Sequence, residues 1–119
     1  MPDIHTIYQS IEQRIKWLEE KTKELSDAGN VKALAIGDYD KAIAIATARL
    51  SLGNVKEVCG IAVEGKPTAA AIKELAKGMC SEERVAQEIA INAYKAVITK
   101  IEVFQASLNG YQSLFRHLQ

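Results

Sequence analysis

One stretch of the chain comes close to the phosphate-binding loop of nucleotide-binding proteins, namely residues 60–68 with the sequence GIAVEGKPT. In that loop a glycine, four further residues and Gly-Lys-Ser/Thr hold phosphates with backbone amides. Here Pro67 stands between Lys66 and Thr68, so it removes one amide and displaces the hydroxyl that would meet magnesium. We therefore interpret residues 60–68 as a glycine-flanked connector that enters a helix at Pro67, and we predict no bound cofactor.

The two histidines, His5 and His117, raise the question of a metal site. Antiparallel packing of the first and last helices would bring them to the same end of the molecule. A metal site needs three or four ligands with supporting hydrogen bonds, and no Glu-x-x-His pair or further cluster accompanies them. His117 is more simply a cation near a helix C-terminus, where it favours the helix dipole, and we predict no metal site.

Catalytic chemistry has no better candidates. Asp38 and Asp40 flank Tyr39, but neighbouring positions on a helix do not face each other, so the two carboxylates do not form an acid/base pair. The spacing suggests no Ser-His-Asp or Cys-His arrangement. We predict that the protein has no catalytic residues and is not an enzyme.

Basic and aromatic residues share one side of the first helix, where Arg14, Trp17 and Lys21 recur. Such a combination can bind single-stranded nucleic acid by base stacking and phosphate contact. The alternative is a solvated, salt-bridged face, since glutamates are interleaved at positions 19, 20 and 24. The whole chain carries 15 basic and 15 acidic residues, which argues against a duplex-coating protein because such proteins usually show a basic excess.

The bulk composition is that of an ordinary globular chain, with 48% apolar and 25% charged residues in a length of 119. We predict one helical domain over residues 1–119. The N-terminal residues lack the basic and apolar parts of a signal peptide, and no run approaches the ~18 apolar residues of a membrane span. Cys59 and Cys80 have no CxxC spacing and are expected to be reduced. We therefore expect a cytoplasmic protein without a membrane segment.

The elements that position these residues are helices. In the last third of the chain, apolar residues alternate at spacings of three and four, which predicts an amphipathic helix over about 82–118. Ser81 is its expected N-cap. The residues of this row are Tyr94, Val97, Ile101, Phe104, Leu108, Tyr111, Phe115 and Leu118.

The first part of the chain has the same spacing, in a row made of Ile4, Tyr8, Ile11, Ile15, Leu18, Thr22 and Leu25. We expect Asp3 to cap this helix and Trp17 to lie beside the row. The row keeps its phase past Gly29 as far as Leu50. Two interpretations are open. We favour one helix over about 3–52 that crosses a weak point at 29–30, because the phase is preserved; the other is a tight turn at Gly29.

Between the long helices we expect a connector and a short helix. Residues 55–65 have strand-like composition and glycine punctuation, and we interpret them as a connector that forms a short hairpin. A helix over about 68–77 follows Pro67 and is closed by Gly78. The predicted fold is therefore all-α, a long antiparallel helical hairpin with a short middle helix.

Residues 31–52 are rich in alanine, and Ile45 and Leu52 lie off the main row, so the apolar face is wide. Such a face needs two neighbours, within the chain or in a second copy. We expect two hairpins to associate, in the manner of a coiled coil, into a helical bundle and hence a homodimer. The alternative is a monomeric three-helix bundle hinged at Gly29.

Several short stretches carry a resemblance to a known group of proteins. They are residues 29–44 with Ala33, Ala35, Asp38, Tyr39, Ala42 and Ala44; Leu75-Ala76-Lys77-Gly78 followed by Glu83; Tyr94-Lys95-Ala96; and Leu108-Asn109, Gln112-Ser113-Leu114 and Arg116. In these stretches the chain resembles small uncharacterised helical proteins of Gram-positive phages and prophages, encoded in the early region near recombination and single-strand-binding genes. It differs from them by extra residues between Arg49 and Pro67. The resemblance implies an intracellular, phage-associated accessory protein and brings no functional residues with it.

The resulting functional prediction is a non-enzymatic helical interaction or accessory protein that acts through self-association or a protein partner. The alternative is an accessory factor that contacts single-stranded DNA in phage replication or recombination. Neither the partner nor any ligand is identified by the sequence. The candidate interaction surface consists of aromatic residues: Trp17, Tyr39, Tyr94, Phe104, Tyr111 and Phe115.

Overall fold

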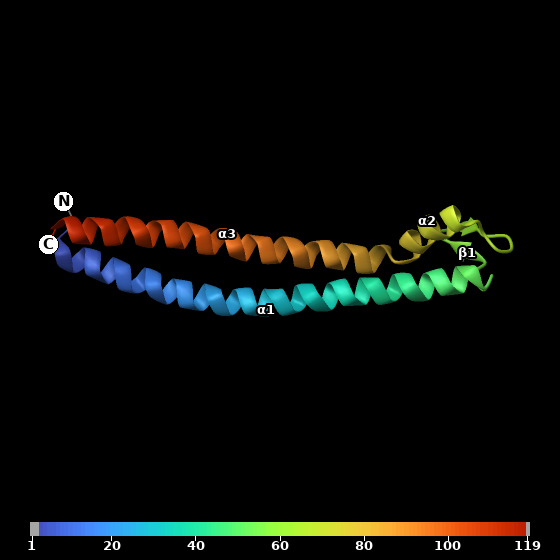
Figure 1. Ribbon diagram of the computed structural model, residues 1–119, viewed down its shortest axis with the longest axis horizontal. Coiled ribbons are helices and arrows are strands. Elements are labelled where there is room, and N and C mark those ends of the chain that lie inside the picture. Colours follow the sequence, from blue (N-terminus) through green and yellow to red (C-terminus); the bar gives the residue numbers. More distant parts are fainter. Residues whose placement is uncertain (1–2, 119) are drawn as a thin grey trace. The chain divides into compact units, whose positions relative to one another are not determined.

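The fold is an all-α helical hairpin in which two long helices pack against each other (Figure 1). The computed structural model describes residues 3–118. Helix α1 spans Ile4–Ser51, helix α3 spans Ser81–Leu118, and the short helix α2 spans Ala69–Met79. The two long helices were predicted from the apolar spacing, and the short one between them from Pro67, Thr68 and Gly78.

Helix α1 crosses Gly29 and Asn30 without a break, so the prediction of one long helix is confirmed and the turn at Gly29 is wrong. A glycine inside a helix costs about 0.5–1 kcal/mol relative to alanine, which packing in a long helix can absorb. The aromatic ring of Tyr94 lies beside Gly29, because a Cβ built on Gly29 would be 3.5 Å from Tyr94 Cε2.

The connector after α1 begins with a glycine turn that ends the helix. The Gly53 backbone has φ 73°, its N–H donates to the Leu50 carbonyl at 3.1 Å, and the Asn54 N–H donates to the Arg49 carbonyl at 3.0 Å. This pair of hydrogen bonds is the Schellman arrangement, which satisfies the last carbonyls of a helix and needs a left-handed residue.

The predicted short hairpin is present as two antiparallel strands, β1 (Glu57–Val58) and β2 (Ile61–Ala62). Both residues of its turn have positive φ, 51° at Cys59 and 80° at Gly60. Two-residue turns of this handedness match the right-handed twist of paired strands.

Two helix boundaries differ from the prediction. Gly78 lies inside α2 instead of closing it, and Ser81 is the first residue of α3 instead of its cap. One residue ends one helix and begins the next: the Cys80 N–H donates to the Ala76 carbonyl at 3.1 Å, and the Cys80 carbonyl accepts from the Arg84 N–H at 3.0 Å. Gly78 faces the β1–β2 hairpin, since a Cβ built there would lie 3.4 Å from Val58 Cγ1.

The predicted cap at the start of α1 is confirmed. Asp3 Oδ1 accepts a hydrogen bond from the Thr6 N–H at 2.7 Å. This hydrogen bond to the charged form lowers the pKa of Asp3 below its ordinary value.

The chain divides into two compact units, both crossed by the long helices. The terminal unit comprises the residues up to Asn30 and those from Asn92 onward, and the central unit is Val31–Ile91. The central unit has a core to which the end of α1, the connector and α2 all contribute. Its buried residues are Ala46, Leu50, Val55, Val58, Ala76 and Cys80.

In the terminal unit the row predicted on α3 is confirmed, with Val97 and Leu108 buried and the others half-buried. The row predicted on α1 is partly wrong, because its members Ile4, Tyr8 and Ile15 are exposed. The covered row on α1 keeps Ile11, Leu18 and Leu25 of the predicted row, but its other members each precede a predicted one by one residue. The complete row is Ile7, Ile11, Arg14, Leu18, Lys21 and Leu25. The aliphatic parts of long cationic side chains cover apolar surface, so arginine and lysine can take part in such a row.

Alanine substitutions should change stability in opposite directions at the two glycines inside α1 and at Gly53 in the turn after it. Gly37→Ala has open space around the new Cβ and Gly29→Ala meets only ordinary contact, so each should raise the free energy of unfolding by about 0.5–1 kcal/mol. Gly53→Ala should lower it, because φ there is 73°. Urea unfolding followed by circular dichroism measures all three, and a lower midpoint for Gly29→Ala would contradict a continuous α1.

Candidate interaction surface

The aromatic residues predicted as an interaction surface are all half-buried, and they fall in both units. Only Tyr39 belongs to the central unit. In the terminal unit the Trp17 ring faces the Phe104 ring at a centroid distance of 5.4 Å, and Tyr8 lies 6.4 Å from Phe115. Trp17 therefore lies within the seam between α1 and α3, not beside it, and its role in binding a partner stays a prediction.

Arg14 is held between aromatic rings of the terminal unit. Its guanidinium carbon lies 4.3 Å from the Tyr111 ring centroid and 5.4 Å from that of Trp17. Its Nε donates to Ser107 Oγ at 2.7 Å and its Nη1 donates to the Ser10 carbonyl at 3.3 Å. These contacts use the ring faces and the cation that would have to stack bases and bind phosphate in a single-stranded DNA site.

The lysine beside Trp17 is paired with an acid. Lys21 Nζ donates to Glu24 Oε2 at 2.6 Å, and Lys100 Nζ lies 3.9 Å from Glu24 Oε1. The hydrogen bond from Lys21 lowers the pKa of Glu24. This side of α1 is therefore the salt-bridged face that the interleaved glutamates indicated.

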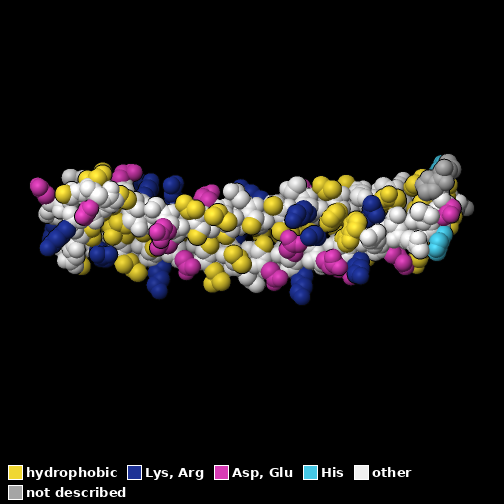
Figure 2. Space-filling view, turned by 180° about the vertical axis from the view of Figure 1, so that it is seen from behind, with side chains coloured by type: hydrophobic (Ala, Val, Ile, Leu, Met, Phe, Trp, Pro, Cys, Tyr) yellow, Lys and Arg dark blue, Asp and Glu magenta, His cyan; other side chains and the backbone are white. Residues whose placement is uncertain are grey.

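The central unit carries large apolar side chains in solvent on both of its long helices (Figure 2). On α1 they recur at spacings of three and eleven, which keep them on one side of the helix, Leu52 follows in the turn after α1, and on α3 the spacing is four. Leu34 is 69% exposed, Ile89 64% and Ile45 51%. We call this surface the apolar face, and its members are Val31, Leu34, Ile45, Leu52, Val85 and Ile89.

A groove of about 260 Å³ runs between α1 and the start of α3 and shares Ile45 with the apolar face. We call it the α1/α3 groove. Most of its lining is apolar, and the charged members are Arg49 and Glu83. The complete lining is Ala42, Ile45, Ala46, Arg49, Met79, Cys80 and Glu83.

Glu83 leaves one oxygen of its carboxyl group unsatisfied. Its Oε2 is buried and has no hydrogen-bond partner within residues 3–118. Burial, and to a smaller extent the Glu83 charge, raise the pKa of the neighbouring Cys80 thiol. Nothing in the sequence indicated this oxygen, because the burial of one atom depends on how the helices pack.

The two cysteines should react at very different rates with a thiol reagent. Cys59 is exposed in the β1–β2 turn, whereas Cys80 is buried and has a raised pKa, so less of it is thiolate at a given pH. We expect iodoacetamide to modify Cys59 first and Cys80 only when the central unit opens, and mass spectrometry of the peptides checks this. Equal rates in the native protein would contradict the core described above.

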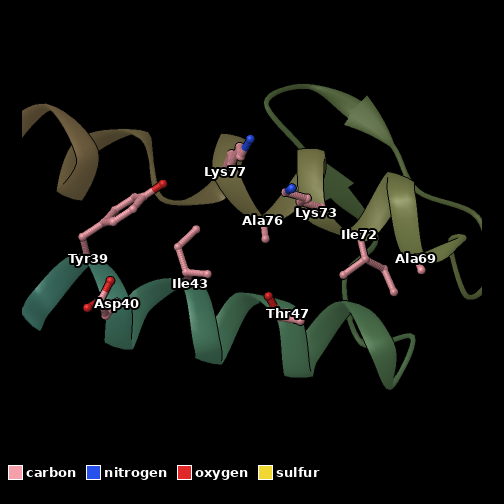
Figure 3. Close-up of a pocket in the computed structure, with 9 residues that line it drawn as sticks. All are labelled: Tyr39, Asp40, Ile43, Thr47, Ala69, Ile72, Lys73, Ala76 and Lys77. Atoms are coloured by element: carbon pink, nitrogen blue, oxygen red, sulfur yellow. The ribbon is translucent and has the colours of Figure 1, made fainter. Parts of the chain in front are cut away.

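A second groove, of about 370 Å³, lies between α1 and α2 in the central unit (Figure 3). Ile43 and Ile72 supply apolar surface, and Lys73 and Lys77 lie one helical turn apart on α2. Lys77 Nζ lies 3.6 Å from Glu74 Oε1, and both side chains are about half or more exposed. The groove can hold a small apolar group, and its charged side chains, Asp40, Lys73 and Lys77, are exposed to solvent.

The residues that suggested nucleotide or metal chemistry lie at the ends of helices. Thr68, which corresponds to the phosphate-loop threonine, is the N-cap of α2, and its Oγ1 accepts from the Ala71 N–H at 3.2 Å. His117 lies in the last turn of α3. Across the part of the chain that the structure describes, no group of three or more metal-binding side chains occurs, and no helix is both long and apolar enough to cross a membrane.

Comparisons with known proteins do not assign the chain to a group. The sequence matches no protein-family model and no curated protein, and no solved structure matches the chain.

Proposed function

We propose that the protein is a non-enzymatic helical interaction module that binds a second copy of itself through the apolar face of the central unit. The observation that carries the proposal is the exposure of large aliphatic side chains on two neighbouring helices. Contiguous exposed apolar patches on a soluble chain mark interaction sites, because covering them removes apolar surface from water. Because the chain resembles phage proteins, we further propose that it acts as a phage or mobile-element accessory factor.

A second copy fits this face because its charges are balanced. Between Leu34 and Ile45 the same side of α1 carries one acid and one base, Asp38 and Lys41, both exposed. A two-fold axis places the same patch on both partners, so one copy's base can meet the other's acid. The formal net charge of +0 adds no long-range repulsion between copies.

The size of the effect is sufficient for a stable pair. Fully burying a leucine or isoleucine side chain contributes about 1.5–3 kcal/mol. Several such side chains from each copy offset the cost of association, which is about 4–15 kcal/mol. We expect a dimer at micromolar concentration, which corresponds to a net binding free energy of about −8 kcal/mol.

Light scattering coupled to a sizing column tests the proposal. The expected mass is twice the 13.0 kDa of one chain. The mass of a single chain at high micromolar concentration would contradict the proposal of self-association.

Contact with single-stranded DNA is the rival proposal and has weaker support, because Arg14 and Trp17 are engaged within the chain. A gel shift at low salt with a single-stranded oligonucleotide separates the two. Binding that falls steeply with added salt would favour the rival.

A further inference from the structure

The unsatisfied carboxyl oxygen of Glu83 is the starting point of this inference. Glu83 lies in the first turn of α3, where its charge favours the helix dipole, yet its buried Oε2 accepts no hydrogen bond from any described residue. A buried charged group without a hydrogen-bond partner destabilises a protein, so such a group usually meets a donor in the functional assembly.

A suitable donor lies in the same groove. Arg49 is exposed in the last turn of α1, and residues 3–118 hold no carboxylate that pairs with it. A guanidinium presents several N–H groups in a planar fork that matches a carboxylate. The remaining lining of the groove is mostly apolar, and covering it would strengthen an ion pair by excluding water.

The two groups do not pair within one chain, although both line the α1/α3 groove. The groove shares Ile45 with the apolar face, so a second copy that covers this face also covers the groove. In a two-fold interface a contact from residue i to residue j is made twice, once in each direction.

We infer that Arg49 of each copy donates to Glu83 of the other across the α1/α3 groove, with the two-fold axis passing close to it. This inference rests on the self-association proposed above and adds the contact that fixes its geometry. Aliphatic side chains alone tolerate several registers of one helix against another. A charged pair in an apolar groove selects one register, because every other register leaves a charge buried without its partner.

Charge reversal tests the inference. Arg49→Glu and Glu83→Arg, each alone, place like charges at both contacts of the dimer, and we expect each to weaken self-association by roughly thirtyfold or more. In an equimolar mixture of the two variants, one copy carries two acids and the other two bases. We therefore expect the mixture to form a heterodimer, detected by native mass spectrometry or light scattering.

The matched control is Arg84→Glu, which changes the same charge one residue from Glu83 but outside the lining of the groove. It should self-associate like the unaltered protein. Circular dichroism checks that every variant is helical, and Arg49→Gln with Glu83→Gln replace the reversals if one of them fails to fold. Each glutamine variant should weaken association, and their mixture should restore it in part, because a heterodimer of the two keeps one Arg49–Glu83 contact.

The outcomes separate this inference from the proposed function. A monomeric unaltered protein overturns both. A dimer that tolerates Arg49→Glu and Glu83→Arg overturns the ion pair and leaves self-association standing. Single variants that dissociate and do not recover on mixing also overturn it, because the pair would then lie within one chain.

Discussion

Replacing Ile45 and Ile89 together with glutamate should leave α1 and α3 helical and weaken self-association by about a hundredfold or more. Both side chains are exposed in the single chain, 51% for Ile45 and 64% for Ile89, so neither supports its core. In the proposed dimer each glutamate would place an unpaired charge in an interface from which water is excluded. Light scattering measures the association and circular dichroism the helix content.

The matched control replaces two exposed isoleucines of the terminal unit, Ile4 and Ile15, with glutamate. Both lie on α1, as Ile45 does, and their side chains are 44% and 41% exposed. We expect the control variant to keep the dimer mass. A dimer that survives Ile45→Glu/Ile89→Glu, or a control that dissociates, would place the contact surface elsewhere.

Leu50→Ala should lower the free energy of unfolding by about 2–5 kcal/mol, the largest stability effect that we expect from a single substitution. The Leu50 side chain is fully buried at 0% exposure in the core of the central unit, beside Val55 and Ala76. Truncating it removes apolar contacts and leaves a cavity that the two strands and α2 cannot fill without shifting. Urea unfolding monitored by circular dichroism gives the value, and faster alkylation of Cys80 reports the same loss locally.

Leu52→Ala is the control two residues further on. Leu52 is 66% exposed on the apolar face, so its truncation should change the stability of the single chain by no more than about 0.5 kcal/mol. Its expected effect is weaker self-association instead. Equal losses of stability at Leu50 and Leu52 would contradict the core as described.

The helices of this fold follow from apolar spacing, but the face that each helix buries follows from it only in part. The row on α3 was predicted because a single three-and-four repeat of large apolar residues is present there. On α1 two such rows run side by side and share Ile11, Leu18 and Leu25. The aliphatic parts of Arg14 and Lys21 decide between the rows, and a pattern that scores these residues as polar does not detect their packing.

The helix ends were harder to predict than the helices. Gly78 and Ser81 have the chemistry of a helix end and a helix start, yet Cys80 supplies both boundary hydrogen bonds through its own backbone. Gly78 instead lets Val58 approach α2 closely. A close approach between segments that are distant in the sequence leaves no local signal.

The interaction surface predicted from the sequence consists of aromatic residues. Large aromatic side chains also pack inside a chain, as Trp17 does against Phe104. Ile45 and Leu52 were predicted to lie off the main apolar row, and the structure leaves both side chains exposed. The isolation of Glu83 Oε2 was beyond prediction because it depends on the burial of one atom.

The central claim is that the apolar face of the central unit is the surface on which two copies meet. Methyl NMR of isoleucine-labelled protein over a dilution series tests it most directly, because exposed isoleucines exist in both units. We expect the methyl signals of Ile45 and Ile89 to shift with concentration, while those of Ile4 and Ile15 stay in place. Signals that are all independent of concentration, or shifts confined to Ile4 and Ile15, would contradict the claim.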